Sequence, residues 1–144
     1  MHLRLNKLIT VILIVVCMPI YSCHSFSSGH PEIIKITGVN VNGDLDLKDA
    51  GDHPAITFKV KAGKTINWVV NTPDVQNIDS IYKKPTTSSD IIFKTGPSRI
   101  GSSKNWTATV DSAATPGQFE DYNIDWTDKD GNKHTFDPRI QVKS

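Results

Sequence analysis

The chain has 144 residues, with 16 Lys and Arg against 15 Asp and Glu, and a formal net charge of +1. This length suits a single domain. A charge so close to zero gives no basic field to attract nucleic acid, so the sequence predicts no nucleic-acid partner.

Residues 1–22 have the features of a signal peptide. Arg4 and Lys7 precede an apolar run at residues 8–16, which is too short to cross a bilayer because a span takes about 20 residues. It has the size of the apolar region of a signal peptide. A buried N-terminal strand or helix is the alternative. Cleavage after residue 22 removes two of the 16 basic residues and none of the 15 acidic ones, which leaves a net charge of about −1.

The signal ends in Ile20-Tyr21-Ser22-Cys23, which resembles the signal of bacterial lipoproteins. In that signal a branched apolar residue and a small residue precede a cysteine, and Tyr21 departs from the usual pattern. The resemblance implies that Cys23 is acylated and becomes the first residue, and two or more acyl chains suffice for stable anchoring. The expected partner is therefore a lipid bilayer. The alternative is ordinary secretory cleavage after Ser25, which would release a soluble protein.

The same resemblance places the protein in the bacterial cell envelope. No run of acidic residues follows Cys23, so we expect the protein to face the periplasm. Residues 23–31 are rich in Ser, Gly and His, a composition typical of a flexible tether. Residues 32–144 then form one domain. It contains no cysteine, because Cys17 lies in the signal and Cys23 precedes the tether. The domain is expected to have no internal disulfide and no thiolate metal site.

The first part of the domain predicts strands and one acidic loop. Residues 32–37 form a strand, and Asn42-Gly43 is typical of a hairpin turn. Four aspartates follow within residues 44–52: Asp44, Asp46, Asp49 and Asp52. Their spacing does not match that of an EF-hand calcium loop. We therefore interpret them as a solvated acidic loop.

Residues 56–70 predict two strands around a tight turn. Apolar residues alternate at Ile56, Phe58 and Val60, and alternate again from Ile66, which is the period of a half-buried strand. Ala62-Gly63 supplies the turn, because glycine adopts positive φ without a Cβ clash. The pattern predicts a β-hairpin.

Residues 73–83 predict the one short helix. Thr72 is a suitable N-cap, Pro73 suits the first helical position, and Val75, Ile78 and Tyr82 are at helical spacing. Further strands follow at residues 90–95, 105–111, 119–127, 133–136 and 139–143, with a Gly/Ser loop at 96–104 and a hairpin at Asp130-Gly131. The fold class predicted is all-β, a single antiparallel β-sandwich with a short helix near residues 73–83.

Two stretches resemble the cupredoxin-like β-sandwich. Residues 58–71 (Phe-Lys-Val-Lys-Ala-Gly-Lys-Thr-Ile-Asn-Trp-Val-Val-Asn) are similar to the strand, turn and strand before that family's first copper ligand. Residues 116–126 are similar to the strand that leads into its ligand loop, and residues 140–142 to its closing strand. An immunoglobulin-like Greek key is the alternative topology.

The copper ligands of that family are not at the matching positions. A type-one copper site uses two His and a Cys thiolate, usually with a weak axial Met. Trp126 or its neighbours stand where the family has Cys, residues 71–79 contain no His, and both methionines lie in residues 1–22. The sequence therefore predicts no type-one copper and no other cofactor.

The remaining candidate residues give weak signals. Four histidines follow the signal, namely His24, His30, His53 and His134. Of these, His134 with Asp137 is the best candidate for a divalent metal. Trp68, Trp106 and Trp126 alternate in phase with aliphatic residues, so we expect them in the core rather than on a sugar-binding platform.

No nucleophile motif is present, and we expect no enzymatic activity and no catalytic residues. The function predicted is a non-enzymatic, lipid-anchored binding or structural module. The alternative is a carbohydrate- or divalent-metal-binding domain that uses the loop end containing His134.

Overall fold

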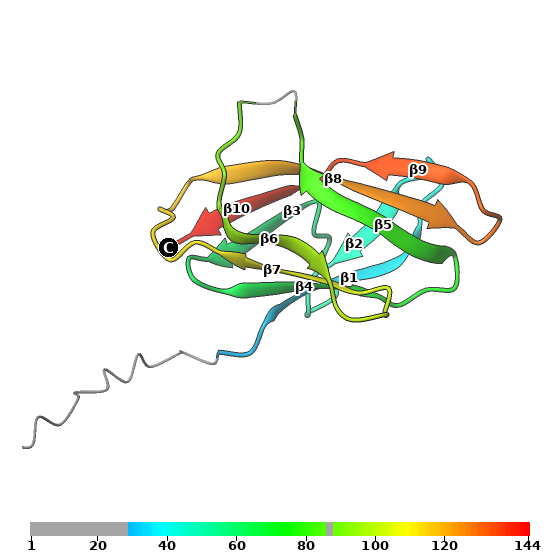
Figure 1. The fold of residues 1–144 in the computed structure, drawn as a ribbon, viewed down its shortest axis with the longest axis horizontal. Helices are drawn as coiled ribbons and strands as arrows, with labels where there is room; N and C mark the ends of the chain where they lie inside the picture. Colours follow the sequence, from blue (N-terminus) through cyan, green and yellow to red (C-terminus); the bar gives the residue numbers. More distant parts are fainter. Residues whose placement is uncertain (1–28, 86–87) are drawn as a thin grey trace, which may run out of the picture.

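The computed structural model describes residues 29–85 and 88–144, and in this part of the chain it has ten β-strands and no helix (Figure 1). The strands are β1 (Glu32–Val39), β2 (Leu45–Lys48), β3 (Thr57–Lys61), β4 (Thr65–Val70), β5 (Val75–Lys83), β6 (Phe93–Arg99), β7 (Trp106–Val110), β8 (Phe119–Asp128), β9 (Lys133–Phe136) and β10 (Arg139–Lys143). The predicted all-β class is confirmed.

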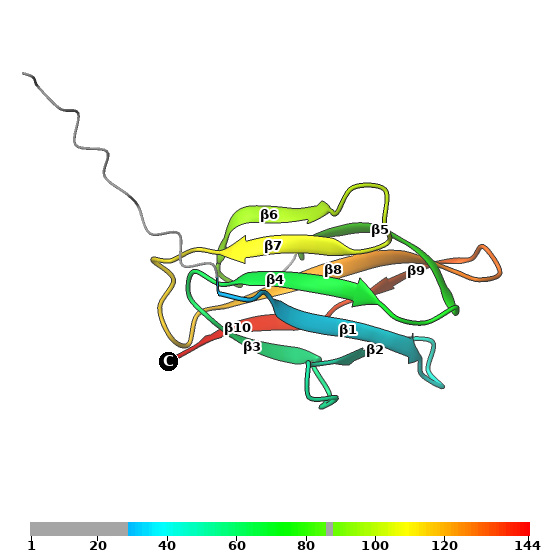
Figure 2. The same cartoon turned by 90° about the horizontal axis from the view of Figure 1, so that it is seen from below.

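The strands form two sheets that pack face to face (Figure 2). The first sheet has the order β2-β1-β4-β7-β6, and the second has the order β3-β10-β8-β5, with β9 paired to β8. Both sheets are mixed, because β1 pairs with β4 and β3 pairs with β10 in parallel. The prediction of a wholly antiparallel sandwich is wrong at these two pairings, since alternation along a strand does not reveal the direction of its neighbour.

Alternate residues of both sheets fill one hydrophobic core. Ile66 and Trp68 of β4, Trp106, Ala108 and Val110 of β7, and Tyr122, Ile124 and Trp126 of β8 are all buried. The prediction that all three tryptophans pack in the core is confirmed. Their rings are consequently not available as a surface platform for sugars.

A hydrogen bond joins the two sheets inside this core. The indole N–H of Trp68, on β4, donates to the hydroxyl oxygen of Tyr122, on β8, at 3.1 Å. The two rings also meet edge to face, with centroids 5.7 Å apart. Burial raises the pKa of the Tyr122 hydroxyl well above its ordinary value, although the hydrogen bond from Trp68 opposes the shift. The hydroxyl therefore stays protonated.

The predicted helix at residues 73–83 is wrong, and the segment is strand β5. Two register shifts, at Val75/Asn77 and at Ile78/Ser80, interrupt its pairing with β8. Each bulge adds one residue, so the buried positions Val75, Ile78 and Ile81 fall three apart. That spacing imitates the apolar face of a helix.

The predicted hairpin at residues 56–70 is also wrong. The two strands and the turn exist, and Gly63 has a φ of 75°. However, β3 belongs to the second sheet and β4 to the first, so the turn crosses between the sheets instead of joining paired neighbours. Ile56, which was expected to point inward, is 59% exposed.

Two other predicted hairpin turns are confirmed, and one predicted strand is shifted along the chain. The turns at Gly43 and Gly131 join the antiparallel pairs β1–β2 and β8–β9, as predicted. The strand expected at residues 90–95 instead runs from Phe93 to Arg99 and takes in part of the expected Gly/Ser loop. It lies at an edge of the first sheet, where a proline such as Pro97 is tolerated.

The described chain enters at the end of the sandwich opposite the β8–β9 hairpin (Figures 1 and 2). The predicted signal peptide at 1–22, Cys23 and most of the predicted tether at 23–31 lie outside the described residues. Within residues 29–85 and 88–144 no helix is long and apolar enough to cross a bilayer.

Candidate functional site

His134 lies on β9 and is held by two neighbours from β8, Trp126 and Asp128. Its ring stacks on the indole of Trp126, with centroids 4.4 Å apart and planes 21° from parallel. Its Nε2 lies 2.9 Å from Oδ2 of Asp128. Trp126 and His134 are direct cross-strand partners in the β8–β9 ladder, so the sheet itself brings the two rings together.

Asp128 organises the hairpin that carries His134. Its carboxylate accepts hydrogen bonds from the backbone N–H groups of Asp130 and Asn132 and from the Asn132 side chain. The pKa of Asp128 is lowered far below its ordinary value, and the hydrogen bond from His134 is the largest cause. The bonds from Asn132 lower the pKa further, whereas desolvation acts in the opposite direction. The carboxylate is therefore ionised and fully engaged in the turn.

Asp128→Asn should lower the melting temperature at neutral pH. Because the folded-state pKa of Asp128 is lowered, its stabilisation is present above the ordinary value of 3.8 and is lost as the pH falls below it. The difference in melting temperature between the variant and the wild type should therefore shrink as the pH is lowered from 7 toward 2, as followed by thermal melts. Asp44→Asn is the matched control, since that carboxylate makes no hydrogen bond within the described residues. Equal acid sensitivity of Asp128→Asn and wild type would contradict the assignment.

The structure does not bring His134 and Asp137 together. Asp137 forms an ion pair with Lys84, beyond the end of β5. His53 bonds to Asp49 in the loop between β2 and β3, and His30 lies ahead of β1. In residues 29–85 and 88–144 no three His, Cys, Asp or Glu side chains are close enough to share a metal ion. His24 lies outside the described residues.

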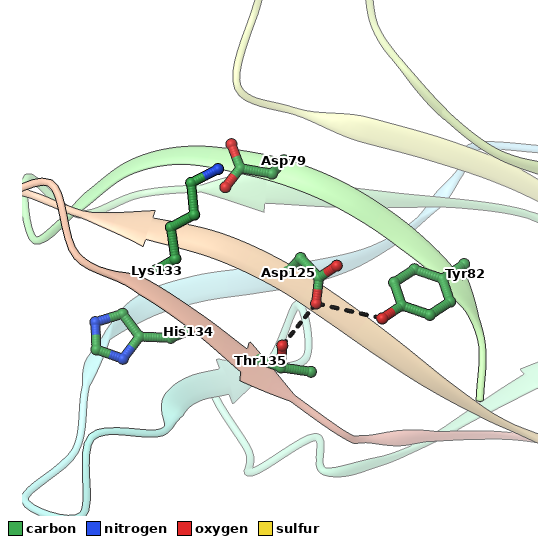
Figure 3. A pocket seen from close by; sticks show the side chains of 6 residues that line it. All are labelled: Asp79, Tyr82, Asp125, Lys133, His134 and Thr135. Atoms are coloured by element: carbon green, nitrogen blue, oxygen red, sulfur yellow. Dashed lines mark hydrogen bonds between the residues drawn. The ribbon is translucent and has the colours of Figure 1, made fainter. Parts of the chain in front are cut away.

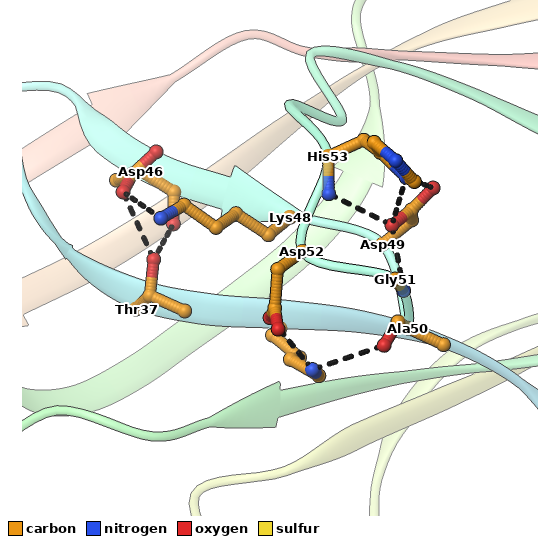
Figure 4. A network of polar contacts seen from close by, with 9 residues as sticks. Thr37, Asp46, Lys48, Asp49, Ala50, Gly51, Asp52 and His53 are labelled. Carbon is orange, nitrogen blue, oxygen red and sulfur yellow. Dashed lines mark hydrogen bonds and ion pairs between the residues drawn. The ribbon is translucent and has the colours of Figure 1, made fainter.

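Three of the four aspartates within residues 44–52, namely Asp46, Asp49 and Asp52, form hydrogen bonds or ion pairs (Figure 4). Asp49 accepts hydrogen bonds from the backbone N–H groups of Gly51 and His53, and the bond from His53 lowers its pKa most. Asp52 lies 2.7 Å from Nζ of Lys35, and the hydrogen bond from that lysine lowers its pKa. Asp46 accepts from the Thr37 hydroxyl at 2.9 Å. These contacts fit the interpretation of a solvated loop.

A polar hollow lies on the outer face of the second sheet, beside His134 (Figure 3). It has a volume of about 380 Å³ and is open to solvent. Strands β5, β8 and β9 contribute its lining, which consists of Asp79, Tyr82, Asp125, Lys133, His134 and Thr135. We call it the Asp125 hollow.

Three hydroxyl groups hold the carboxylate of Asp125 in place. Thr135 donates to its Oδ1 at 2.7 Å, Ser80 to its Oδ2 at 3.0 Å, and Tyr82 to its Oδ1 at 3.4 Å. The donors come from β9 and β5, on either side of β8 (Figure 3). The carboxylate therefore lies in a fixed orientation before any ligand arrives.

Asp79 is held in a similar way. It accepts from the Asn77 amide and the Thr127 hydroxyl, both at 2.7 Å. Partial burial alone would raise its pKa, but these two hydrogen bonds and the charge of Lys133 outweigh burial, so that the pKa is lowered. Figure 3 shows the Lys133 side chain extending toward Asp79. The hollow thus presents an oriented anionic group at each of two positions.

A second hollow, of about 400 Å³, lies at the loop end of the sandwich on the other side of His134. Val39 and Gly43 of the first hairpin, Asp74 ahead of β5 and the turn after Asp128 line it. The buried indole N–H of Trp126 has no hydrogen-bond partner in the described part of the chain. His134 is common to both hollows.

Sequence reasoning identified His134 and missed the other residues of the Asp125 hollow. Asp79 and Tyr82 fall in the segment predicted to be a helix, which would have separated them from Asp125. A strand prediction alone would not have brought them together, because residues three apart lie on opposite faces of a regular strand and Asp79 and Tyr82 share the outer face only through the bulge at Ile78/Ser80. In the structure Tyr82 is 38% exposed, whereas the tryptophans are buried.

Comparison of the chain with models of protein families gave no match, and comparison with curated proteins gave none either.

Proposed function

We propose that the protein is a non-enzymatic binding module, anchored in a bacterial envelope membrane through acylated Cys23. The observation that supports it best is the Asp125 hollow, in which two carboxylates are oriented by neighbouring side chains and remain open to solvent. Preorganised polar groups that line a hollow are typical of a binding site.

The position of the hollow favours this role. The chain enters the domain at the end opposite the β8–β9 hairpin (Figure 2). Residues 23–31 would reach about 30 Å when extended. The anchor would therefore hold the domain by one end and direct His134 and the hollow away from the bilayer, toward the periplasm. The alternative is release as a soluble secreted protein.

The proposed fold family is the cupredoxin-like sandwich without its type-one copper ligands. In support, the two stretches that resemble that family form β3, β4 and β8, and residues 140–142 lie in β10. Trp126, near the family's Cys position, packs in the core against His134. We propose no catalysis, because His134 is engaged by Asp128 and by Trp126 rather than facing a nucleophilic hydroxyl.

Membrane fractionation of wild type and Cys23→Ala tests the anchor. We expect the wild type in the membrane fraction and the variant in the soluble fraction, with labelled fatty acid incorporated only into the wild type. A Cys23→Ala protein that still sediments with membranes, or a wild type that is secreted, would show that this part of the proposal is wrong.

A thermal-shift screen tests the binding role. A ligand in excess raises the melting temperature of the state that binds it. The panel should contain copper, zinc and calcium ions and cell-wall sugars. A shift with a sugar supports the module with a carbohydrate ligand, and a shift with an ion supports the divalent-metal alternative. No shift with any of them would favour a structural role.

A further inference from the structure

We infer that the Asp125 hollow binds a carbohydrate through its hydroxyl groups. This inference rests on the proposed binding function and specifies the chemical class of its ligand. It depends on three observations, which are the spare acceptor positions of the two carboxylates, the donor groups of Lys133 and Tyr82 in the same lining, and the partial exposure of Tyr82.

The carboxylates retain capacity to accept hydrogen bonds. An ionised carboxylate offers about four acceptor positions. Asp125 uses three of them, for Ser80, Tyr82 and Thr135. Asp79 uses two, for Asn77 and Thr127. Both groups can therefore accept from a ligand without giving up the contacts that orient them.

Two donors face the same space. The ammonium group of Lys133 extends toward Asp79 (Figure 3) and forms no ion pair within 4.0 Å in the described part of the chain. The Tyr82 hydroxyl donates to Asp125 at 3.4 Å, which is long for a bond between oxygens. It also accepts from the Asn123 amide at 3.2 Å. The phenolic proton is therefore loosely held and free to turn to a ligand oxygen.

A sugar hydroxyl matches both sets of groups. The carboxylates require donors and Lys133 requires an acceptor, and a hydroxyl group is both. Neighbouring hydroxyls on one ring could therefore bind Asp79, Asp125 and Lys133 together. A simple cation would leave the ammonium group unmatched, and a simple anion would face two carboxylates.

The shape of the hollow agrees with this ligand class. Its volume of about 380 Å³ lies in the range of small-molecule sites. Tyr82, at its wall, is 38% exposed, and an aromatic ring offers an apolar surface to the C–H groups of a sugar ring. Because the hollow is open to solvent, an extended glycan could occupy it with one or two residues.

Calorimetric titration of the full lipidated protein in nanodiscs tests the inference. The probes are the trimer of N-acetylglucosamine, maltotriose and, as a zwitterionic control, trialanine. We expect at least one trisaccharide to bind. Asp125→Asn should weaken that binding about tenfold or more, since a hydrogen bond to a charged group contributes about 1.5–3 kcal/mol. Asp44→Asn, the same change in the turn ahead of β2, should leave it within about twofold.

Further variants separate the contributions of Tyr82 and Lys133 to sugar binding. Tyr82→Phe keeps the ring and should retain more affinity than Tyr82→Ala, and Lys133→Met should weaken binding without loss of the fold, as checked by thermal melts. The inference is overturned when neither trisaccharide binds, or when Asp125→Asn and Asp44→Asn bind equally well. Trialanine binding that depends on Asp125 would overturn the carbohydrate class but leave the binding module in place. Failure of the proposed binding function would be recognised separately, because then no compound in the thermal-shift panel would raise the melting temperature.

Discussion

Trp68→Ala is expected to lower the free energy of unfolding by about 3–5 kcal/mol, the usual cost of removing a buried aromatic ring. Trp68 is fully buried at the centre of the first sheet and contacts both Phe93 and Tyr122. Its removal opens a cavity between the two sheets and deletes the hydrogen bond that joins them. Urea unfolding followed by circular dichroism measures the loss.

Tyr122→Phe is the matched variant for the hydrogen bond alone. It keeps the ring and leaves the buried Trp68 N–H without an acceptor, which should cost about 1–3 kcal/mol. If Tyr122→Phe were as stable as the wild type, the cross-sheet bond would have no stabilising role. If Trp68→Ala cost under about 1 kcal/mol, the assignment of Trp68 to a tightly packed core would be wrong.

Glu120→Ala is expected to lower the free energy of unfolding by about 1–3 kcal/mol, because it leaves a buried backbone N–H unsatisfied. Glu120 lies on β8, is 3% exposed, and accepts a hydrogen bond from the N–H of Ile92 at 2.9 Å. That bond holds the chain ahead of β6 against the end of the second sheet. Equilibrium unfolding in urea provides the measurement, with Asp44→Asn, a partly exposed position, as the control.

Glu120 should also make stability depend on pH. Burial raises its pKa above the ordinary value of 4.5, although the N–H of Ile92 and the charge of Lys83 act in the opposite direction. The folded state therefore binds the proton more tightly, and the stabilisation is present below pH 4.5 and is lost as the pH rises through the folded-state pKa.

Glu120→Gln keeps an acceptor for Ile92 and has no charge to desolvate. Its stability relative to the wild type should therefore improve as the pH is raised from 4 to 8, in unfolding experiments at each pH. A constant difference between the two proteins over this range would contradict the raised pKa.

Much of the sandwich follows from local patterns in the sequence. Residues 106–110 and 119–127 alternate strictly between buried and partly exposed positions, and this period specifies a strand and its inward face. Asn42-Gly43 and Asp130-Gly131 specify their hairpins because the turns need positive φ at Gly43 and Gly131. Such features are encoded within a few residues.

Features that depend on the partner of a strand were not predictable in this way. The turn at Gly63 is the same whether the flanking strands pair or separate into two sheets. The bulges in β5 arise from its register with β8, and they shift apolar residues to a spacing that otherwise indicates a helix. The Asp125 hollow was hidden for the same reason, because Asp79, Asp125 and Thr135 meet only once β5, β8 and β9 are aligned.

The parallel pairing of β3 with β10 affects how the domain can assemble. Residues 57–61 are hydrogen-bonded to residues 139–143, which in turn pair with the start of β8. The second sheet therefore cannot close until nearly all of residues 29–144 have been synthesised, and contacts so distant in sequence slow folding. A chain that folds late remains extended for longer, which would help the export that we propose for this protein.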